Sequence, residues 1–473
     1  MTDPRRRYAL TQAHPGEEDR FFVEALDKTQ WRPAGSGPEG DDWDTLWHVG
    51  MPPAAAFQRA RDGRLVNHIP GSGALTVKSS LADHIHRTRD QLAALYGDDS
   101  EPAQAMDMIP PTYCLPRDRT ALEAAAAAEP GALWLLKPAN SARGQGIRLL
   151  DDPRGIQPPG SPEGGWIVQR YLADPHLIDH RKYVLRLYVL IRSVAPLRVE
   201  RYAQGFAKLA SHAYTLDDLT DPYIHQTNPD INATNAQVDD PVVFIDLEAY
   251  RARLAAEGLD ADGLFRRIDR LIACSVWAAR PTMDRATRAA GADPTSCYEF
   301  LGLDCLVDRD LRPWLLECNL NPSLGVFAGP ADGGEEEARI KRAMVYDLVD
   351  RLGLNDPQRP HEDRPTPAGG FQPLASDIKA LAPPLPRLTP GRVDEHIDDH
   401  GLRLYDRQRQ RWLQPNETAS LIWLLACDGQ GLEAIVDELR ELPGADDDRD
   451  TLAHTVWSTL AEWTRQGLLH PLA

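Results

Sequence analysis

The sequence has few cysteines, no paired cysteines and no long apolar run, and each of these absences excludes a class of protein. Its 473 residues include six cysteines, which lie far apart and never form a CxxC pair. Neither a zinc site nor a disulfide framework is indicated, and the pattern is typical of a reducing cytosol. No stretch approaches the roughly 20 apolar residues of a membrane span, and MTDPRRRYAL lacks the apolar run of a secretory signal. We therefore expect a cytoplasmic protein that does not bind membranes.

Positive charge is also scarce. The chain has 52 Lys and Arg residues against 71 Asp and Glu residues, which gives a net charge of −19. Such a surface repels nucleic acid, although it leaves room for a local basic pocket that holds a nucleotide. Because 42% of the residues are hydrophobic, the chain can bury real cores and is not a disordered composition. Its length suits roughly three or four domains.

Residue patterns predict alternating strands and helices up to about residue 355. An alanine-rich run before WLLKP and an apolar periodicity further on predict helices, the latter over 262–280, with another over 340–354. Runs of β-branched and aromatic residues predict strands near 45–49 and over 134–137, 166–172, 181–194, 298–308 and 312–319. The strand over 181–194 is apolar on both faces, so we expect it to be central in its sheet.

The stretch WLLECNLNPSLG, residues 314–325, places Glu317 and Asn319 on one face of a strand. If the DRDL turn forms a hairpin, Asp304 lies beside both of them. Two carboxylates and an amide oxygen could then hold Mg²⁺, which prefers few protein ligands and oxygen donors. Without a cation the two carboxylates would repel each other. The convergence therefore indicates either a metal site or a strand end that reaches solvent.

Two further features could bind phosphate. The stretch KPANSARGQGI, residues 137–147, places a lysine at a strand end before a glycine loop containing Arg143. Such a loop can close its N–H groups over phosphates, but it is neither a Walker A motif nor a dinucleotide fingerprint. Lys182 and Arg186 share a face of the long strand, where cations are costly unless they meet anions. The alternative is an edge strand whose cations reach solvent.

Taken together and in this order, these segments resemble the tubulin–tyrosine ligase-like family of ATP-grasp ligases. The resemblance covers roughly residues 40–355 and rests on VNHIPGSGALTVKSSL, IPPTYCLP, LLKPANSARGQGI, IVQRYL, RKYVLRLYVLI, YIHQTN, FLGLDCLVD and WLLECNLNPSL. It implies an α+β, ATP-grasp fold with subdomains over residues 1–105, 106–172 and 173–355. It also implies ATP and two Mg²⁺ ions as cofactors.

The resemblance further implies a role for each matching residue. The backbone of Gln169, Arg170, Tyr171 and Leu172 would read the adenine edge as a hinge. Phosphates would contact Lys137, Lys182, Arg143 and, more weakly, Lys78. The γ-phosphate and the acceptor carboxylate would be surrounded by Arg186, Lys208, His225, Thr227 and Asn228. The Mg²⁺ ions would be held by Asp304, Glu317 and Asn319.

The chain departs from the family pattern at two positions. The family usually has an Asp that resembles a ribose contact where this chain has Val184, and it tends to have an Arg at Lys208. The loss of a hydrogen bond to a charged group costs about 1.5–3 kcal/mol, so Val184 implies weaker ATP binding or a changed nucleotide preference. Lys208 keeps the charge but loses the bidentate fork. Cys318 lies between two predicted ligands, but its side chain should face the other way.

The composition changes after residue 355. Proline is dense over 356–390, which predicts an extended linker, and residues 391–473 form a compact tail. A hairpin across DRQRQ, an N-cap at Asn416 and three apolar stripes predict a small helical bundle with its own core. This tail resembles the winged-helix PqqD-like fold, which includes the RiPP recognition element. That resemblance implies an extended leader peptide bound at a sheet edge.

The favoured hypothesis joins both resemblances. We expect an ATP- and Mg²⁺-dependent ligase that joins an amino acid or other amine to a carboxylate through an acyl-phosphate. Its substrate would be a ribosomally made precursor peptide whose leader is held by residues 391–473. One alternative is a degenerate ATP-grasp scaffold that binds peptides without catalysis, a hypothesis that Val184 favours. Another is a ligase that acts on a folded protein or a small molecule.

Overall fold

The computed structural model describes residues 3–10, 20–35, 40, 42–141, 144–160, 162–239, 241–329, 333–356, 370–374, 384–443 and 448–471. Contacts divide the chain into two units. Unit 1 comprises Met1–Ala82, Met108–Val194 and Arg198–Ala375, and unit 2 comprises Asp83–Asp107, Ala195–Leu197 and Ser376–Ala473. The division does not follow the predicted domain boundaries, because residues 83–107 group with the tail. Those boundaries stay predictions.

The first sheet of unit 1 is parallel and has the strand order β2-β1-β3-β4. Its strands are β1 (Arg6–Leu10), β2 (Trp31–Pro33), β3 (Thr45–Trp47) and β4 (Leu65–Val66), with helices α1 (Arg20–Ala25) and α2 (Ala54–Arg59) between them in sequence. The strand predicted near residues 45–49 is β3. Trp31 and Trp47 are buried, so this sheet packs aromatic side chains into the interior.

The second sheet of unit 1 is antiparallel and has the order β5-β8-β6-β7. Its strands are β5 (Thr112–Leu115), β6 (Trp134–Pro138), β7 (Arg148–Leu150) and β8 (Trp166–Arg170), and α6 (Arg119–Ala128) follows β5. The alanine-rich helix and the strands over 134–137 and 166–172 are therefore confirmed. Trp134, Leu136, Trp166 and Val168 form a separate core with Leu122 of α6.

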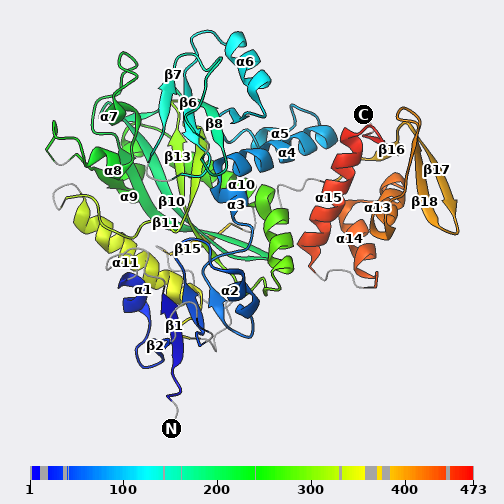
Figure 1. Cartoon of the computed structure of the whole chain (residues 1–473), viewed down its shortest axis with the longest axis horizontal. Helices are drawn as coiled ribbons and strands as arrows, with labels where there is room; N and C mark the ends of the chain where they lie inside the picture. The colour runs from blue at the N-terminus through cyan, green and yellow to red at the C-terminus, as the bar shows by residue number, and fades with distance from the viewer. Residues whose placement is uncertain are drawn as a thin grey trace. The chain divides into compact units, whose positions relative to one another are not determined.

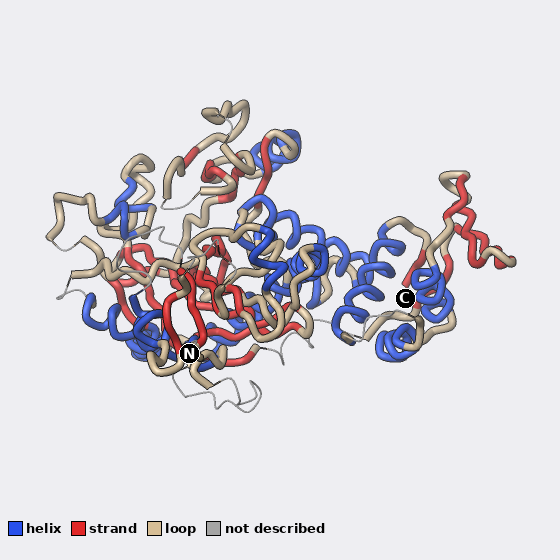
Figure 2. The backbone as a smooth tube through the Cα atoms, turned by 60° about the horizontal axis from the view of Figure 1, so that its bottom comes forward, coloured by secondary structure: helices blue, strands red, loops and turns tan. Residues whose placement is uncertain are grey.

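The largest sheet of unit 1 has the strand path β12-β11-β10-β13-β14, to which β9 and β15 add by pairing with β10 and β11. Its strands are β9 (Leu177–Ile178), β10 (Arg181–Val194), β11 (Leu197–Leu209), β12 (Phe244–Asp246), β13 (Glu299–Val307), β14 (Pro313–Leu320) and β15 (Phe371–Pro373). The prediction that the strand over 181–194 is central is confirmed, because β10 lies between β11 and β13. Figure 2 shows the strands of this unit gathered together with helices around them.

Two long helices of unit 1 extend beyond their predicted limits. Helix α10 spans Ala261–Ala289 and continues past Pro281, although an internal proline removes a helical hydrogen bond. Burial of Met283 and Thr287 beyond the proline stabilises the continuation. Helix α11 spans Gly334–Arg351 and begins earlier than predicted, with three glutamates in its first turn, where the helix dipole favours negative charge. It lies beside α1 (Figure 1).

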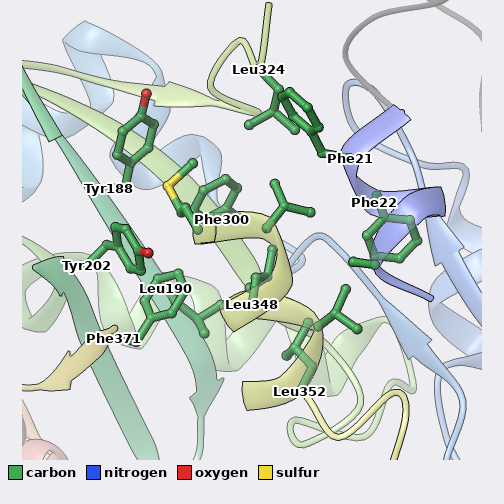
Figure 3. Close-up of a cluster of buried hydrophobic side chains, with 14 of the residues drawn as sticks. Phe21, Phe22, Tyr188, Leu190, Tyr202, Phe300, Leu324, Leu348, Leu352 and Phe371 are labelled. Atoms are coloured by element: carbon green, nitrogen blue, oxygen red, sulfur yellow. The ribbon is translucent and has the colours of Figure 1, made fainter. Parts of the chain in front are cut away.

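The remaining helices of unit 1 are short and surround the sheets. They are α3 (Gly73–Thr76), α7 (Pro222–His225), α8 (Pro229–Asn232) and α9 (Leu247–Ala256). The main core joins the first and largest sheets, because α1 and α11 contribute to one aromatic cluster with β10, β11, β13 and β15 (Figure 3). Tyr188 stacks on Phe300, and Phe371 of β15 packs against Tyr202. Strand β15 thus lies in the range predicted as linker, where it extends the sheet.

Unit 2 contains most of α4 (Lys78–Tyr96), α5 (Glu101–Ala105) and the tail. The tail has β16 (Leu388–Pro390), β17 (Val393–Asp398), β18 (Gly401–Asp406), β19 (Arg411–Leu413), α13 (Glu417–Cys427), α14 (Leu432–Arg440), α15 (Arg449–Arg465) and β20 (Leu469–Pro471). The predicted hairpin joins β18 to β19, and Asn416 caps α13 by accepting from the Ala419 N–H at 2.8 Å. Strand β16 pairs with β20, so the predicted linker contains a second strand. The rest of that linker lies largely outside the described residues.

Candidate functional site

A cavity of about 430 Å³ lies inside unit 1, between residues of the second sheet, the largest sheet and the segment 219–228. Ten of the residues that line it bear on the sequence predictions: Lys78, Lys137, Lys182, Val184, Lys208, His225, Thr227, Asn228, Asp304 and Glu317. The sequence therefore predicted much of the lining, although these residues come from several separate segments. Val184 contributes an apolar, buried side chain to this wall and offers no acceptor to a ligand.

The acidic side chains on β13 and β14 converge as predicted. Asp304 pairs with Glu317 across the two strands, and Gly302 pairs with Asn319. A bulge after Asp304 interrupts the register. The Asn319 side-chain N–H donates to Oε1 of Glu317 at 3.3 Å. The three predicted metal ligands thus lie on adjoining strands, while Cys318 is buried, and burial raises the pKa of its thiol.

Each of these carboxylates contacts cationic side chains. Nε of Arg186 donates to Oδ1 of Asp304 at 2.7 Å, and Nζ of Lys208 donates to Oδ2 at 3.0 Å. Burial alone would favour the neutral acid, but the charges of Arg186 and Lys208 outweigh it and hold the pKa of Asp304 well below its usual range. Nζ of Lys78 lies 3.0 Å from Oε2 of Glu317. Asp304 and Glu317 are therefore negatively charged groups enclosed by donors.

Lys137 and Lys182 differ from these cations because neither has a carboxylate partner among the described residues. Nζ of Lys137 donates to Oε1 of Gln169 at 2.7 Å, and Nζ of Lys182 donates to the Tyr171 hydroxyl at 3.1 Å. Burial lowers the pKa of Lys137 to about 8, and burial together with the neighbouring Lys137 charge lowers the pKa of Lys182 to about 7. Buried ammonium groups with neutral partners form a site for an anion.

Three predicted catalytic residues follow in the segment 225–228. His225 ends α7, Thr227 is buried, and the Asn228 side chain caps α8 by accepting from the Asp230 N–H at 2.8 Å. Both ring nitrogens of His225 have partners: Nδ1 lies 2.9 Å from the Tyr171 hydroxyl, and Nε2 lies 2.8 Å from the Asp218 carbonyl oxygen. His225 therefore has no ring nitrogen left to transfer a proton to a ligand.

The predicted adenine hinge does not line the cavity. The N–H groups of Arg170 and Tyr171 donate to the carbonyls of Pro111 and Leu133, each at 2.8 Å. These two N–H groups are therefore occupied by neighbouring segments, and the reading of the adenine edge by other backbone groups of residues 169–172 stays a prediction. Gln169 instead points at Lys137, Arg170 pairs with Glu129 at 3.0 Å, and Leu172 is half-buried outside the lining. Arg143 lies outside the described residues.

A second cavity of about 280 Å³ adjoins the first, and Lys208, Asn228 and Glu317 line both. Arg186 and Asn319 line this second cavity rather than the first. The wall also includes Lys341 of α11, whose Nζ donates to Oε1 of Glu337 at 2.6 Å. The predicted ligand-binding residues therefore divide between two adjoining cavities that share Lys208, Asn228 and Glu317.

Sequence reasoning missed several lining residues. Gln226 lies directly before Thr227 in YIHQTN, and its buried Oε1 has no hydrogen-bond partner among the described residues. Gly144 has φ of +69°, and an added Cβ would lie 2.7 Å from that oxygen. The i, i+4 spacing of Glu337 and Lys341 could have revealed the second cavity's lysine. Nothing in the sequence shows that Gln226 and Gly144 meet, because they belong to distant segments.

The residues present fit a hard cation. Within the described part of the chain, no cluster of three His, Cys, Asp or Glu side chains could hold a metal ion. Two carboxylates and one amide nevertheless supply oxygen donors of the kind that Mg²⁺ takes together with phosphate and water. The donor set therefore suits a cation that arrives with a phosphate ligand.

Fold and site together define a mixed α/β protein with buried lysines and paired acidic residues around one ligand cavity. The chain belongs to the tubulin-tyrosine ligase family, whose model matches residues 58–356. The prediction of this family is thereby confirmed. The match ends near the close of α11 and does not extend into the tail.

The names of similar proteins agree with membership of this family. The probable tubulin polyglutamylase TTLL2 of Mus musculus is 29% identical over 327 residues, which are 67% of this chain and 56% of that protein. The tubulin polyglutamylase TTLL5 of Homo sapiens is 30% identical over 340 residues, 69% of this chain and 25% of that protein. The tubulin monoglutamylase TTLL4 of Homo sapiens is 28% identical over 325 residues, 66% and 25% respectively. The chain thus spans about half or less of these relatives' lengths.

These comparisons correct two predictions. The expected substrate, a ribosomally made precursor peptide, is wrong, since the relatives are named for action on tubulin, a protein. The expected partner, a leader peptide held by residues 391–473, is wrong for the same reason. The PqqD-like resemblance of the tail finds no support, because the family model stops at residue 356.

Among the described helices, none combines the length and apolarity needed to cross a membrane.

Proposed function

We propose that this protein is an ATP- and Mg²⁺-dependent ligase that joins the amino group of glutamate to a carboxylate of a protein acceptor. Membership of the tubulin-tyrosine ligase family supports the ligase, and the names of the relatives support glutamate and a protein acceptor. One observation carries the proposal. Lys137 and Lys182 are buried in the same cavity as Asp304 and Glu317, and neither has a carboxylate partner among the residues that the structure describes.

The buried lysines account for the nucleotide. A triphosphate would supply the negative charge that the two ammonium groups lack, so binding it would offset the cost of their burial. Asp304, Glu317 and Asn319 would hold Mg²⁺, which when bound neutralises phosphate charge. That two ions bind stays a prediction. Catalysis of this kind consists mainly of positioning and charge stabilisation, and it needs no Ser or Cys nucleophile.

The second cavity accounts for the other substrates. Lys208 lines both cavities and Arg186 lines the second, and the donors of both contact Asp304. There they would orient the acceptor carboxylate while the γ-phosphoryl group passes to it and forms an acyl-phosphate. The amine would then attack, the amide bond would form and phosphate would leave. Asn228 lines both cavities and Thr227 lines the first, and both would contribute polar contacts to the transferring group.

A radiolabelled glutamate assay tests the proposal. The protein would be incubated with Mg-ATP, labelled glutamate and either tubulin or a glutamate-rich carrier protein, and both ADP and protein-bound label would be measured. We expect ADP and label to appear together and EDTA to abolish both. Omission of the acceptor should leave at most slow ATP hydrolysis. Absence of Mg-dependent nucleotide binding would overturn the ligase, whereas binding and turnover with another amino acid would overturn glutamate alone.

A further inference from the structure

Four groups form a continuous hydrogen-bonded chain behind the first cavity. Nζ of Lys182 lies 3.1 Å from the Tyr171 hydroxyl, which lies 2.9 Å from Nδ1 of His225. Nε2 of His225 lies 2.8 Å from the backbone oxygen of Asp218. The Lys182 ammonium also lies 4.3 Å from the centre of the Tyr171 ring. Lys182, Tyr171 and His225 are all buried, so water does not compete for these contacts.

The groups at its two ends set the donor-to-acceptor direction along this series of hydrogen bonds. The Asp218 carbonyl can only accept, so Nε2 of His225 donates to it. In the neutral ring Nδ1 is then an acceptor, and the Tyr171 hydroxyl donates to it. The tyrosine oxygen is left to accept, and the ammonium of Lys182 can only donate. With a neutral His225, every donor in this arrangement therefore meets an acceptor.

We propose that Tyr171 is a positioning residue, which fixes the Lys182 ammonium at the phosphate site, and that His225 acts only through Tyr171. This inference rests on the proposed function and assigns a side-chain role to a residue predicted to act through its backbone. It also replaces the predicted direct role of His225. A hydroxyl that donates to an imidazole becomes a better acceptor, since hydrogen bonds in a chain polarise one another. The hydrogen-bonded series thus stabilises the charged form of a lysine that has no carboxylate partner in the described part of the structure.

One neighbouring group, the Tyr214 hydroxyl, interacts with the Tyr171 hydroxyl and offers it a second acceptor besides His225. Lys137 is the neighbouring cation, and its ammonium donates to Gln169. Tyr214 lies edge-on to His225 with ring centres 6.1 Å apart, and its hydroxyl donates to the Ala173 carbonyl at 2.8 Å. Asp221 accepts from Nδ1 of His212 at 2.7 Å. The burial of His225 and the nearby Lys182 charge lower the pKa of the imidazole, which agrees with a neutral ring.

The first arm of the test needs no ligand. Nitrogen-15 NMR of histidine-labelled full-length protein would report the tautomer of each ring at pH 7, with the His225 signals assigned by their loss in His225→Phe. We expect a neutral His225 protonated at Nε2, and a shift of its Nδ1 signal in Tyr171→Phe. Tyr223→Phe is the matched control. It removes an exposed hydroxyl that contacts Thr234, on a residue two positions before His225 in the sequence. A charged ring, the opposite tautomer or an unchanged Nδ1 in Tyr171→Phe would overturn the proposal.

The second arm is a double-mutant cycle on nucleotide binding and turnover. We expect Tyr171→Phe and His225→Phe each to weaken Mg-ATP binding by about tenfold, and the double variant to be no weaker than the poorer single variant. Both single substitutions should mainly raise KM and change kcat little. A loss in kcat of about a hundredfold in His225→Phe, with Tyr171→Phe unaffected, would show that His225 touches the reacting groups and overturn the proposal. A wild-type protein that binds no Mg-ATP would overturn the proposed function instead, and the NMR arm would still decide the role of Tyr171.

Discussion

Arg186 on β10 lies directly opposite Asp304 on β13, and the two side chains form a bidentate ion pair with Nε–Oδ1 and Nη2–Oδ2 distances of 2.7 and 3.2 Å. A bidentate pair between an arginine and a carboxylate has a defined geometry, because two parallel N–H···O bonds fix the orientation of both groups. Lys208 joins the same carboxylate. The predicted metal ligand and two predicted catalytic cations therefore form one unit, and Asp304 holds both cations in place.

Replacement of Asp304 by asparagine tests this unit. We expect Asp304→Asn to lose Mg-dependent nucleotide binding and turnover, and to lose stability because two buried cations lose their anion. Isothermal titration with and without Mg²⁺ and urea unfolding would measure these effects. Asp310→Asn is the control, since Asp310 lies exposed in the turn between the same two strands. If Asp304→Asn consumed ATP at the parental rate, the assignment of the metal site would be wrong.

The lowered pKa values of Lys137 and Lys182 predict a pH dependence. Phosphate favours the protonated amines, so binding should take up protons, and affinity should fall by up to about tenfold per pH unit for each lysine as pH rises above about 7 to 8. Titration calorimetry in buffers of different ionisation enthalpy would count the protons. An affinity that is constant from pH 6.5 to 9 would contradict the prediction.

The lowered pKa of Lys182 also predicts that, without nucleotide, the stability of the protein rises with pH, whereas nucleotide affinity falls with pH. The pKa of Lys182 is lowered from 10.5 to about 7, so between these values the unfolded chain binds more protons, and this residue's contribution makes stability rise with pH. Urea unfolding of the parent and of Lys182→Met across this range would show it. The stability advantage of the methionine variant should shrink as pH rises.

Gly144 and Gly155 provide a matched pair of substitutions. Both have positive φ, +69° and +66°, so alanine should cost about 1–2 kcal/mol in either place. At Gly144 the added Cβ would also lie 2.6 Å from Cδ1 of Ile231, whereas at Gly155 it would meet nothing within 4 Å. We expect weaker nucleotide binding in Gly144→Ala alone. Equal nucleotide affinities in the two variants would show that the contact does not shape the cavity.

A buried charge cluster away from the cavity should control stability rather than catalysis. Glu200 accepts from Nε of Arg192 at 2.6 Å and from Nε of Arg351 at 2.7 Å, and it is 1% exposed. Glu200→Gln should destabilise the fold by about 3–5 kcal/mol, because two buried cations lose their partner. Glu336→Gln on the exposed part of α11 should cost at most about 1 kcal/mol. Denaturant unfolding would separate the two.

The sequence by itself determined several of the strands and helices and many of the charged residues that line the cavity. Alternating and apolar runs fixed β6, β8, β10, β13 and β14, and the strand period fixed that Glu317 and Asn319 share a face. The order of the motifs also indicated the family. These features depend on neighbouring residues, so they could be read without knowledge of distant contacts.

Only the tertiary structure decided which charges meet. The pairing of β10 with β13 brings Arg186 to Asp304, and the carbonyls of Pro111 and Leu133 occupy the N–H groups of Arg170 and Tyr171 in the predicted hinge. Burial of residues beyond Pro281 stabilises the continuation of α10. The Asp218 carbonyl occupies Nε2 of His225, so this ring has no free nitrogen. Each of these outcomes depends on segments far apart in the chain, whose contacts local periodicity does not specify.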